Sequence, residues 1–235
     1  MAVDVQSGLT LRLKYVQDRE LHYNIKTSVA QEMIDKGTTL GKEQNAFEAE
    51  MIQRVLRVEP DGSGHVITSS RPIGAAAPAP VPGAPNREVS YSHLGAQGEV
   101  LEISGFNPGS SYAFPDGAVK VGGAWQGSTR LQIPTRPEPI DGVNRFKLLG
   151  SEQVNGYDCV KIEVKADKRS FQVALPDGSG VALVEIESEG AMWFAPAEGF
   201  LVKLDMLTLS KPTIGESTFD TKNRLVQELV KIEQP

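Results

Sequence analysis

The sequence has a single cysteine and no long hydrophobic run, and each shortage excludes a class of protein. Cys159 stands alone among 235 residues, so neither an intrachain disulfide nor a cysteine-based zinc site of ordinary ligand number can form. No run approaches the roughly 18 apolar residues of a membrane-spanning helix. The start, "MAVDVQSGLTLRLKYV", lacks the basic end and apolar centre of a signal peptide. We expect no membrane-spanning segment, while removal of a leader or lipid anchor stays open.

Positive charge is also scarce. Lys and Arg total 24 against 30 Asp and Glu, which gives a net charge of -6, and no basic cluster rises above this average. A protein that follows a phosphate backbone needs a basic surface. We therefore predict that nucleic acid is not a partner.

Sequence motifs that carry chemistry are missing as well. There is no G-x-S-x-G, no H-E-x-x-H and no glycine-rich phosphate loop. His22, His65 and His93 lie on separate segments. Alternating carboxylates at Glu185, Glu187 and Glu189 are typical of a solvated sheet face. We predict no catalytic residues, no metal site and no cofactor, and hence a protein that is not an enzyme.

The sequence does show apolar residues that alternate with polar ones, a period of two. "LTLRLKYV" at 9–16 alternates leucine with polar residues, and the alternation resumes at residue 21 after a short polar turn. These patterns predict two strands. Residues 46–58 place Phe47, Ala49 and Met51 on one face, and their β-branched neighbours favour a long strand over a helix.

Proline and glycine punctuate these strands. The turn "PDGSG" occurs at 60–64 and again at 176–180, and each copy predicts a hairpin tip because glycine accepts the left-handed conformation of such turns. A calcium loop at Asp61 is disfavoured because regularly spaced acidic ligands are missing. Residues 72–87 form a Pro/Ala-rich connector of extended character. Similar strands follow this connector at once, so we expect one β-rich domain over 1–235.

Two segments near the C-terminus raise specific questions. Around the most apolar stretch, "GAMWFAPAEGFLVKLDM" at 190–206, "APAEG" predicts a hairpin loop with a β-bulge nearby. Met192 and Phe194 then share one face and Trp193 takes the other. Cys159 alternates with apolar neighbours as a packed, unreactive thiol. Residues 221–233 fit a helix and a strand equally well.

Around a dozen strands with no βαβ alternation predict a mainly β protein with little helix. Its architecture is expected to be a single large curved antiparallel sheet, a half-barrel. The concavity of a curled sheet has to be filled by side chains, by a helix or by a ligand.

Three segments, in this order, carry a family resemblance: "FPDGAVKVGGAW", "KLLGSEQVNGYDCVKIEV" and "GAMWFAPAEGFLVKLDM". They resemble uncharacterised bacterial envelope families related to the lipoprotein-carrier fold (LolA/LolB-like), best over 114–207. The chain departs from the pattern at Gly123, where those families usually have an acidic residue, and no lipid-attachment cysteine precedes the domain. The Pro/Ala-rich connector is also its own.

The resemblance implies a LolA-like half-barrel with an apolar concave face and a periplasmic or extracellular, envelope-associated location. The resulting hypothesis is a non-enzymatic cell-envelope protein that binds a hydrophobic ligand, such as a lipid acyl chain, in the concave sheet. The candidate ligand-binding residues are Trp125, Met192, Trp193, Phe194, Phe200 and Leu204. The alternative is a structural or interaction module with a self-filled core that acts through an envelope protein partner.

Overall fold

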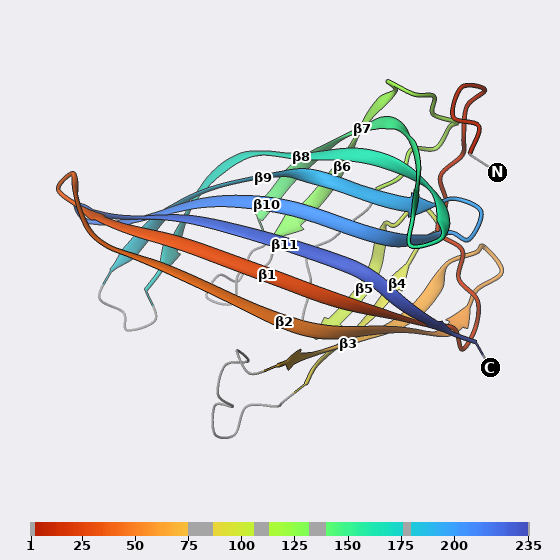
Figure 1. Ribbon diagram of the computed structural model, residues 1–235, viewed down its shortest axis with the longest axis horizontal. Coiled ribbons are helices and arrows are strands. Elements are labelled where there is room, and N and C mark those ends of the chain that lie inside the picture. Colours follow the sequence, from red (N-terminus) through yellow and green to blue (C-terminus); the bar gives the residue numbers. More distant parts are fainter. Residues whose placement is uncertain (1–2, 75–86, 106–112, 132–139, 176–179, 235) are drawn as a thin grey trace.

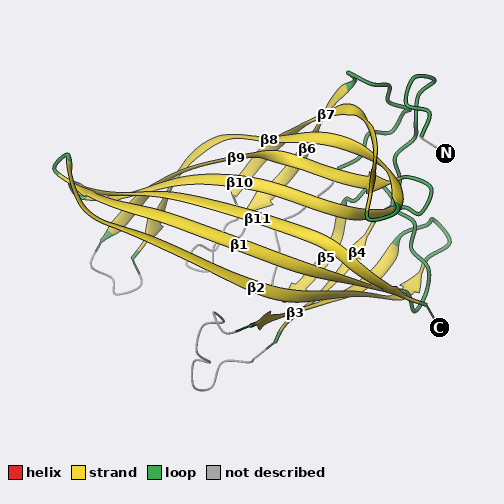
Figure 2. Cartoon of the chain, viewed as in Figure 1, coloured by secondary structure: helices red, strands yellow, loops and turns green. Residues whose placement is uncertain are grey.

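The strand is the one regular element in the parts of the chain that the structure describes. This computed structural model describes residues 3–74, 87–105, 113–131, 140–175 and 180–234. Eleven strands form a single antiparallel sheet in the order β5-β4-β3-β2-β1-β11-β10-β9-β8-β7-β6 (Figure 2). They are β1 (Glu20–Asp35), β2 (Thr38–Val58), β3 (Gly64–Ile73), β4 (Glu88–Leu94), β5 (Val100–Gly105), β6 (Ala124–Leu131), β7 (Ile140–Val154), β8 (Tyr157–Ala174), β9 (Val181–Ala195), β10 (Phe200–Ile214) and β11 (Ser217–Glu233). The predicted mainly β fold is confirmed.

The middle of the sheet consists of long strands whose alternation follows the sequence pattern. β2 covers 46–58, so the choice of strand over helix there is confirmed, and β11 resolves 221–233 as a strand. β1 pairs with both, with Tyr23 opposite Met51 on one side and Leu229 on the other. Residues opposite each other in a ladder share a face. The apolar set of each strand therefore continues across its neighbours.

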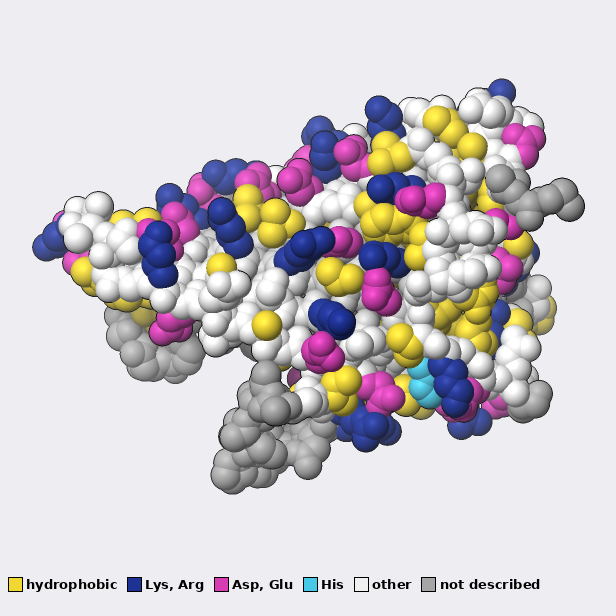
Figure 3. Space-filling model, in the orientation of Figure 1, with side chains coloured by type: hydrophobic (Ala, Val, Ile, Leu, Met, Phe, Trp, Pro, Cys, Tyr) yellow, Lys and Arg dark blue, Asp and Glu magenta, His cyan; other side chains and the backbone are white. Residues whose placement is uncertain are grey.

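The sheet curls into an open trough. Both edges, β4 and β5 on one side and β6 on the other, lie behind β1, β11 and β10 in Figure 1. We call the face with Met192 and Phe194 the inner face and the face with Trp193 the outer face. Lys and Arg side chains interleave with Asp and Glu over the convex side of the sheet (Figure 3). The concave side is the inner face.

One end of the trough is closed by two segments outside the sheet, residues 3–19 and 113–123. Leu13 N donates to Ala96 O in the β4–β5 turn, and Lys14 N donates to Gly199 O in the β9–β10 turn. Since these turns belong to opposite sides of the sheet, the N-terminal segment crosses the concavity. The prediction of a strand at 9–16 is wrong, because only Leu9 forms a bridge, with Val119. The alternation was read correctly, since the leucine side chains do point inward.

Two apolar clusters form the core, both toward the closed end. The first fills the inner face and consists of Val5, Leu11, Phe114, Phe146, Leu148, Val160, Ile162, Val164, Met192, Phe194 and Leu201. The second consists of Leu21, Tyr23, Met51, Cys159, Ala195, Phe200, Val202 and Leu229. Leu11 is fully buried, and burying such a side chain contributes about 1.5–3 kcal/mol. The N-terminal segment is thus part of the core.

The turns agree with the glycine pattern where the structure describes them. Gly62 has φ 85° and its N–H donates to Glu59 O, so the first "PDGSG" is the β2–β3 hairpin tip. The centre of the second copy, 176–179, lies outside the described residues, but it joins the antiparallel strands β8 and β9. Most of the Pro/Ala-rich connector, 75–86, is likewise outside the described part.

Candidate functional site

The structure divides the six predicted ligand-binding residues between the two faces of the sheet. Met192 and Phe194 are each 1% exposed and lie on the inner face. Leu204, opposite Met192, and Trp125 are half-buried against the same cluster. Trp193 and Phe200 belong to the second cluster and point to the outer face. The predicted bulge is confirmed as a register shift between Leu201 and Lys203, and the six residues do not form one surface.

The apolar part of the inner face is already occupied by the protein itself. Phe114 packs against Phe194 with ring centroids 4.6 Å apart. Trp125 stacks on Phe146 at 5.5 Å, and its Nε1 donates to Ala113 O at 2.9 Å. Aromatic contacts of this kind, with the indole N–H satisfied, are typical of a core. Phe194 and Trp125 are therefore in contact with residues of the closing segments, and all four inner residues pack in the same cluster.

Beyond these segments the inner face becomes mixed in character. Its buried polar side chains are Thr27, Ser90, Ser92, Thr129 and Gln227. A pocket of about 170 Å³ opens here and is lined by Thr129, Asn144, Val164, Ala166, Asp167, Arg169, Ile186, Glu187, Ser188 and Met206. The resemblance implied an apolar concave face, whereas this part of the trough combines hydroxyl and amide groups with aliphatic ones. Such a lining suits an amphipathic group better than a purely apolar one.

Arg169 supplies positive charge to this inner pocket. Its Nε is buried and has no hydrogen-bond partner. Burial lowers the pKa of Arg169 from its ordinary value, and the nearby Asp167 carboxylate opposes this shift; an arginine nonetheless stays charged near neutral pH. A buried N–H without an acceptor is costly unless an anion or another acceptor engages it. The unused N–H of Arg169 Nε thus offers a donor to an acceptor group, beside Asp167 and Glu187 in the same lining.

Gly142 makes room for this side chain. A Cβ placed at Gly142 would lie 2.1 Å from Cζ of Arg169, so the guanidinium lies directly over the glycine. Gly142 is opposite Thr129, which lines the same pocket. The absence of a side chain at 142 thus positions the arginine.

Strict alternation would have placed Arg169 on the outer face. Val164 and Ala166 point inward, so residue 168 should point inward next. A register shift between Ala166 and Arg169 adds one residue and reverses this order. Arg169 pairs with Ile186, whose side chain is on the inner face, so Arg169 points inward. A β-bulge re-aims side chains in this way. The polar run "ADKRS" marks the site in the sequence, but it does not say which residue turns inward.

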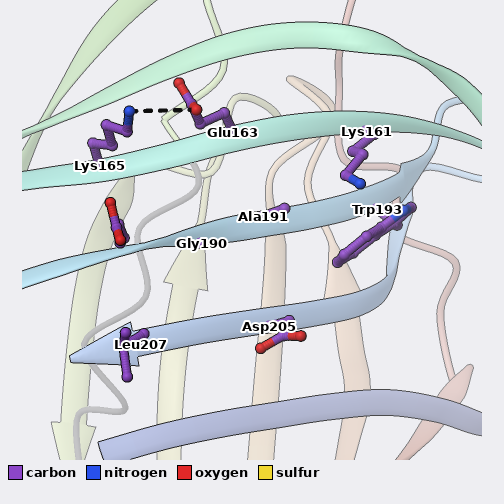
Figure 4. A pocket seen from close by; sticks show the side chains of 9 residues that line it. Lys161, Glu163, Lys165, Gly190, Ala191, Trp193, Asp205 and Leu207 are labelled. Carbon is purple, nitrogen blue, oxygen red and sulfur yellow. Dashed lines mark ion pairs between the residues drawn. The ribbon is translucent and has the colours of Figure 1, made fainter. Parts of the chain in front are cut away.

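Trp193 borders a groove of about 370 Å³ on the outer face (Figure 4). The ring is held between two lysines, with Lys161 Nζ 5.0 Å and Lys203 Nζ 5.5 Å from its centroid. Its Nε1 donates to the Glu152 carboxylate. Both lysines come from the neighbouring strands, directly opposite Trp193. The indole is already engaged, which makes it a poor platform for a flat ligand.

The outer face also carries a polar cluster around two histidines. The His65 and His93 rings stack with centroids 4.1 Å apart. Ser63 Oγ lies 2.8 Å from His93 Nε2 and 2.7 Å from Asp61 Oδ1. In a nucleophilic triad the carboxylate orients the histidine, whereas Asp61 holds the serine. Asp61 accepts hydrogen bonds from both the backbone N–H and the hydroxyl of Ser63, which orders the turn.

Comparisons with known proteins found matches only among solved structures. No protein-family model matches the chain, and no curated protein matches it. Among solved structures, one from Bacteroides fragilis NCTC 9343, described as a "putative exported protein with YmcC-like fold", is 13% identical with a TM-score of 0.38. The match covers 96% of this chain and 100% of that one. At this level of similarity the match carries no argument about function. No helix in the described residues is long and apolar enough to cross a membrane.

Proposed function

We propose that this chain is a non-enzymatic protein of the cell envelope that binds one amphipathic anionic ligand in its trough. The observation that carries the proposal is the buried Nε of Arg169, which has no hydrogen-bond partner on a mixed polar and aliphatic wall. The ligand class is an acyl chain that ends in a carboxylate or a phosphate. The envelope location rests on the sequence resemblance of the three segments named above.

The two parts of such a ligand match the two parts of the wall. The anionic head accepts hydrogen bonds from Arg169, with Thr129 and Ser188 close by in the same lining. The tail lies along Val164 and Met206, which continue the apolar cluster at the closed end. A volume of about 170 Å³ is below the roughly 300–1,000 Å³ of a pocket for a whole ligand. The pocket therefore holds one end of the ligand, and the rest extends along the trough.

Calorimetric titration with palmitate and with hexadecanol tests the proposal, because the two share a tail and differ in charge. We expect one equivalent of palmitate to bind, at least about tenfold more tightly than hexadecanol, since hydrogen bonds to a charged group contribute about 1.5–3 kcal/mol. Arg169→Gln removes this preference. Arg71→Gln is the matched control that should keep the preference, because Arg71 pairs with Glu50, its side chain is 52% exposed, and neither residue lines the pocket.

Gly142→Ala provides a second test that leaves Arg169 in the chain. The new Cβ displaces only the far end of a flexible side chain, so the fold persists while the guanidinium moves. Palmitate binding should weaken toward the Arg169→Gln value. Equal affinity for palmitate and hexadecanol in the wild-type protein would remove the anionic part of the proposal, and binding of neither would remove the whole.

A second candidate function is an interaction module, and strand β5 favours it. All six residues of β5 are exposed, including the apolar Val100, Leu101 and Ile103, and β5 is an edge of the sheet. An exposed apolar edge strand can pair with an extended segment of a partner. A Leu101→Cys variant carrying a thiol cross-linker should then yield one discrete protein adduct in cells. Leu40→Cys, also exposed, is the control that should not.

A further inference from the structure

Three side chains with metal-binding atoms meet on the outer face near the ends of β1 and β11. They are Glu20 and His22 on β1 and Glu233 on β11, and one ligand atom of each lies within 4.8 Å of the others. The His22 side chain is 15% exposed and Glu20 is 25% exposed. The site is separate from the inner pocket, because Glu20 and His22 are on the face opposite to Tyr23.

A β-bulge brings the third residue to this face. His22 pairs with Lys231, but Tyr23 pairs with Leu229, so Val230 is an extra residue in β11. Without this bulge Glu233, four residues after the inward-facing Leu229, would point inward. With it, Glu233 lies opposite Glu20 on the outer face. Bulges that re-aim a side chain are frequent beside functional sites.

The distances within the cluster fit an ion better than they fit direct hydrogen bonds. His22 Nε2 lies 3.4 Å from Glu20 Oε2 and 3.9 Å from Glu233 Oε2. A hydrogen bond would need about 2.7–3.2 Å. Ligands bound at about 2.0–2.2 Å in a tetrahedron lie roughly 3.4 Å from one another. His22 Nε2 is also buried without a hydrogen-bond partner, which leaves its lone pair or its proton unused by the protein.

The neighbouring cations leave the relevant oxygen atoms available. Arg54 lies 3.5 Å from Glu20 Oε1, and Lys231 contacts Glu233 Oε1. In both glutamates the oxygen that faces His22 is Oε2, which these cations do not contact. The cations thus hold the carboxylates in place without filling the space between the three ligand atoms.

We propose that Glu20, His22 and Glu233 bind one divalent transition-metal ion, with water completing its coordination. One imidazole and two carboxylates suit Zn²⁺ or Mn²⁺, whereas Mg²⁺ and Ca²⁺ prefer ligand sets made of oxygen alone. The ion joins the last residues of β11 to the first residues of β1. It therefore stabilises the C-terminal strand, in addition to the ladder hydrogen bonds.

Titration of the tag-free protein with Zn²⁺ tests the site. We expect one equivalent to bind and to raise the midpoint of thermal unfolding, because an ion that binds only the folded state stabilises it. Co²⁺ in place of Zn²⁺ should give the visible absorption of a site with nitrogen and oxygen ligands. Mg²⁺ at the same concentration should do neither.

Variants locate the ion. His22→Gln and Glu233→Gln should each weaken Zn²⁺ binding at least about tenfold, as the loss of a direct ligand costs no less than that of an outer partner. Both side chains are on the outer face, and thermal unfolding without metal checks that each variant folds. His65→Gln combined with His93→Gln is the control that should leave binding unchanged.

Two results would overturn the proposal. If the double variant at His65 and His93 abolished binding while His22→Gln did not, the ion would belong to the stacked histidines. If no stoichiometric binding of Zn²⁺ or Co²⁺ occurred, the three side chains would not form a metal site. Neither result would affect the palmitate experiment, because the inner pocket shares no residue with this cluster.

Discussion

Tyr23 Oη donates a buried hydrogen bond of 3.0 Å to the backbone carbonyl of Leu201, although β11 lies between their strands. The contact exists because β10 pairs with β11 only from Lys203 onward, so the two strands separate at this level. The Tyr23 side chain, 1% exposed, fills the space between them. It links the two halves of the sheet at the closed end.

Tyr23→Phe should therefore destabilise the protein while keeping the aromatic ring in place. Removing the donor leaves a buried carbonyl without this partner, which costs about 1–3 kcal/mol. Urea unfolding followed by fluorescence should show a lower midpoint with an unchanged slope. Tyr157→Phe is the control, because its edge contact with Phe200 needs only the ring. An equal loss in both variants would argue against the cross-strand hydrogen bond.

Gly190 is a position where the sheet has no room for a side chain. A Cβ there would lie 2.1 Å from the backbone oxygen of Asp205, and backbone cannot move aside as a side-chain end can. Gly190→Ala should cost about 1–3 kcal/mol of unfolding free energy. Gly41→Ala in β2, with no atom within 4 Å of the new Cβ, should be neutral or slightly stabilising. Thermal unfolding of the two variants makes the comparison.

Period two was sufficient to predict most strands and their faces. Phe47, Ala49 and Met51 share the inner face as expected, and Cys159 is packed with 0% exposure. This succeeded because side-chain direction in a strand is a local property. Sheet membership is not local. Residues 9–16 have the strand pattern, yet their backbone groups bond to turns at Ala96 and Gly199.

The sequence did not reveal the residues on which both proposals rest. Arg169 and Glu233 each follow a bulge, and one extra residue reverses the face of everything after it. A bulge near the "APAEG" hairpin was predicted so that Phe194 could pair with Phe200. The bulge exists, but Phe194 pairs with Leu201 and the extra residue is Val202. No comparable mismatch marks the other two, since polar residues surround them. The predicted ligand-binding residues were chosen for their apolar character. They lie on both faces of the sheet because successive side chains of a strand point to opposite faces.

Cys159 should be inert in the folded protein. Burial raises the pKa of its thiol to about 11, so the reactive thiolate is about one part in a thousand at pH 8. A disulfide reagent such as DTNB should label no thiol in the native protein at pH 8 and one per chain after urea unfolding. Leu101→Cys, at an exposed position, should add one thiol that reacts at once. Rapid labelling of the wild-type protein would show that β8 opens locally.

Two hydrogen bonds join Arg224 to Asp205 on the outer face. Arg224 Nε donates to Asp205 Oδ1 at 2.9 Å, and Nη2 donates to Oδ2 at 2.8 Å. Arg224 lowers the pKa of Asp205 below its ordinary value. A lowered carboxyl pKa in the folded state means that the stabilisation is present above the unfolded-state pKa and is lost as the pH falls through the folded one. Because Arg224 is 60% exposed, solvent screening limits the pair to about 0.5–1 kcal/mol.

Asp205→Asn should accordingly be less stable than the wild-type protein by this amount at pH 7. The difference should shrink as the pH is lowered from 5 toward 2, because the wild-type carboxyl then becomes protonated and loses its charge. Urea unfolding of both proteins across this pH range measures the difference. Asp220→Asn is the matched control, since Asp220 lies 3.8 Å from Lys211 in an exposed ion pair and should contribute less than about 0.5 kcal/mol. A gap between Asp205→Asn and wild type that stayed constant with pH would mean that the substitution acts through packing in the outer groove instead of through charge.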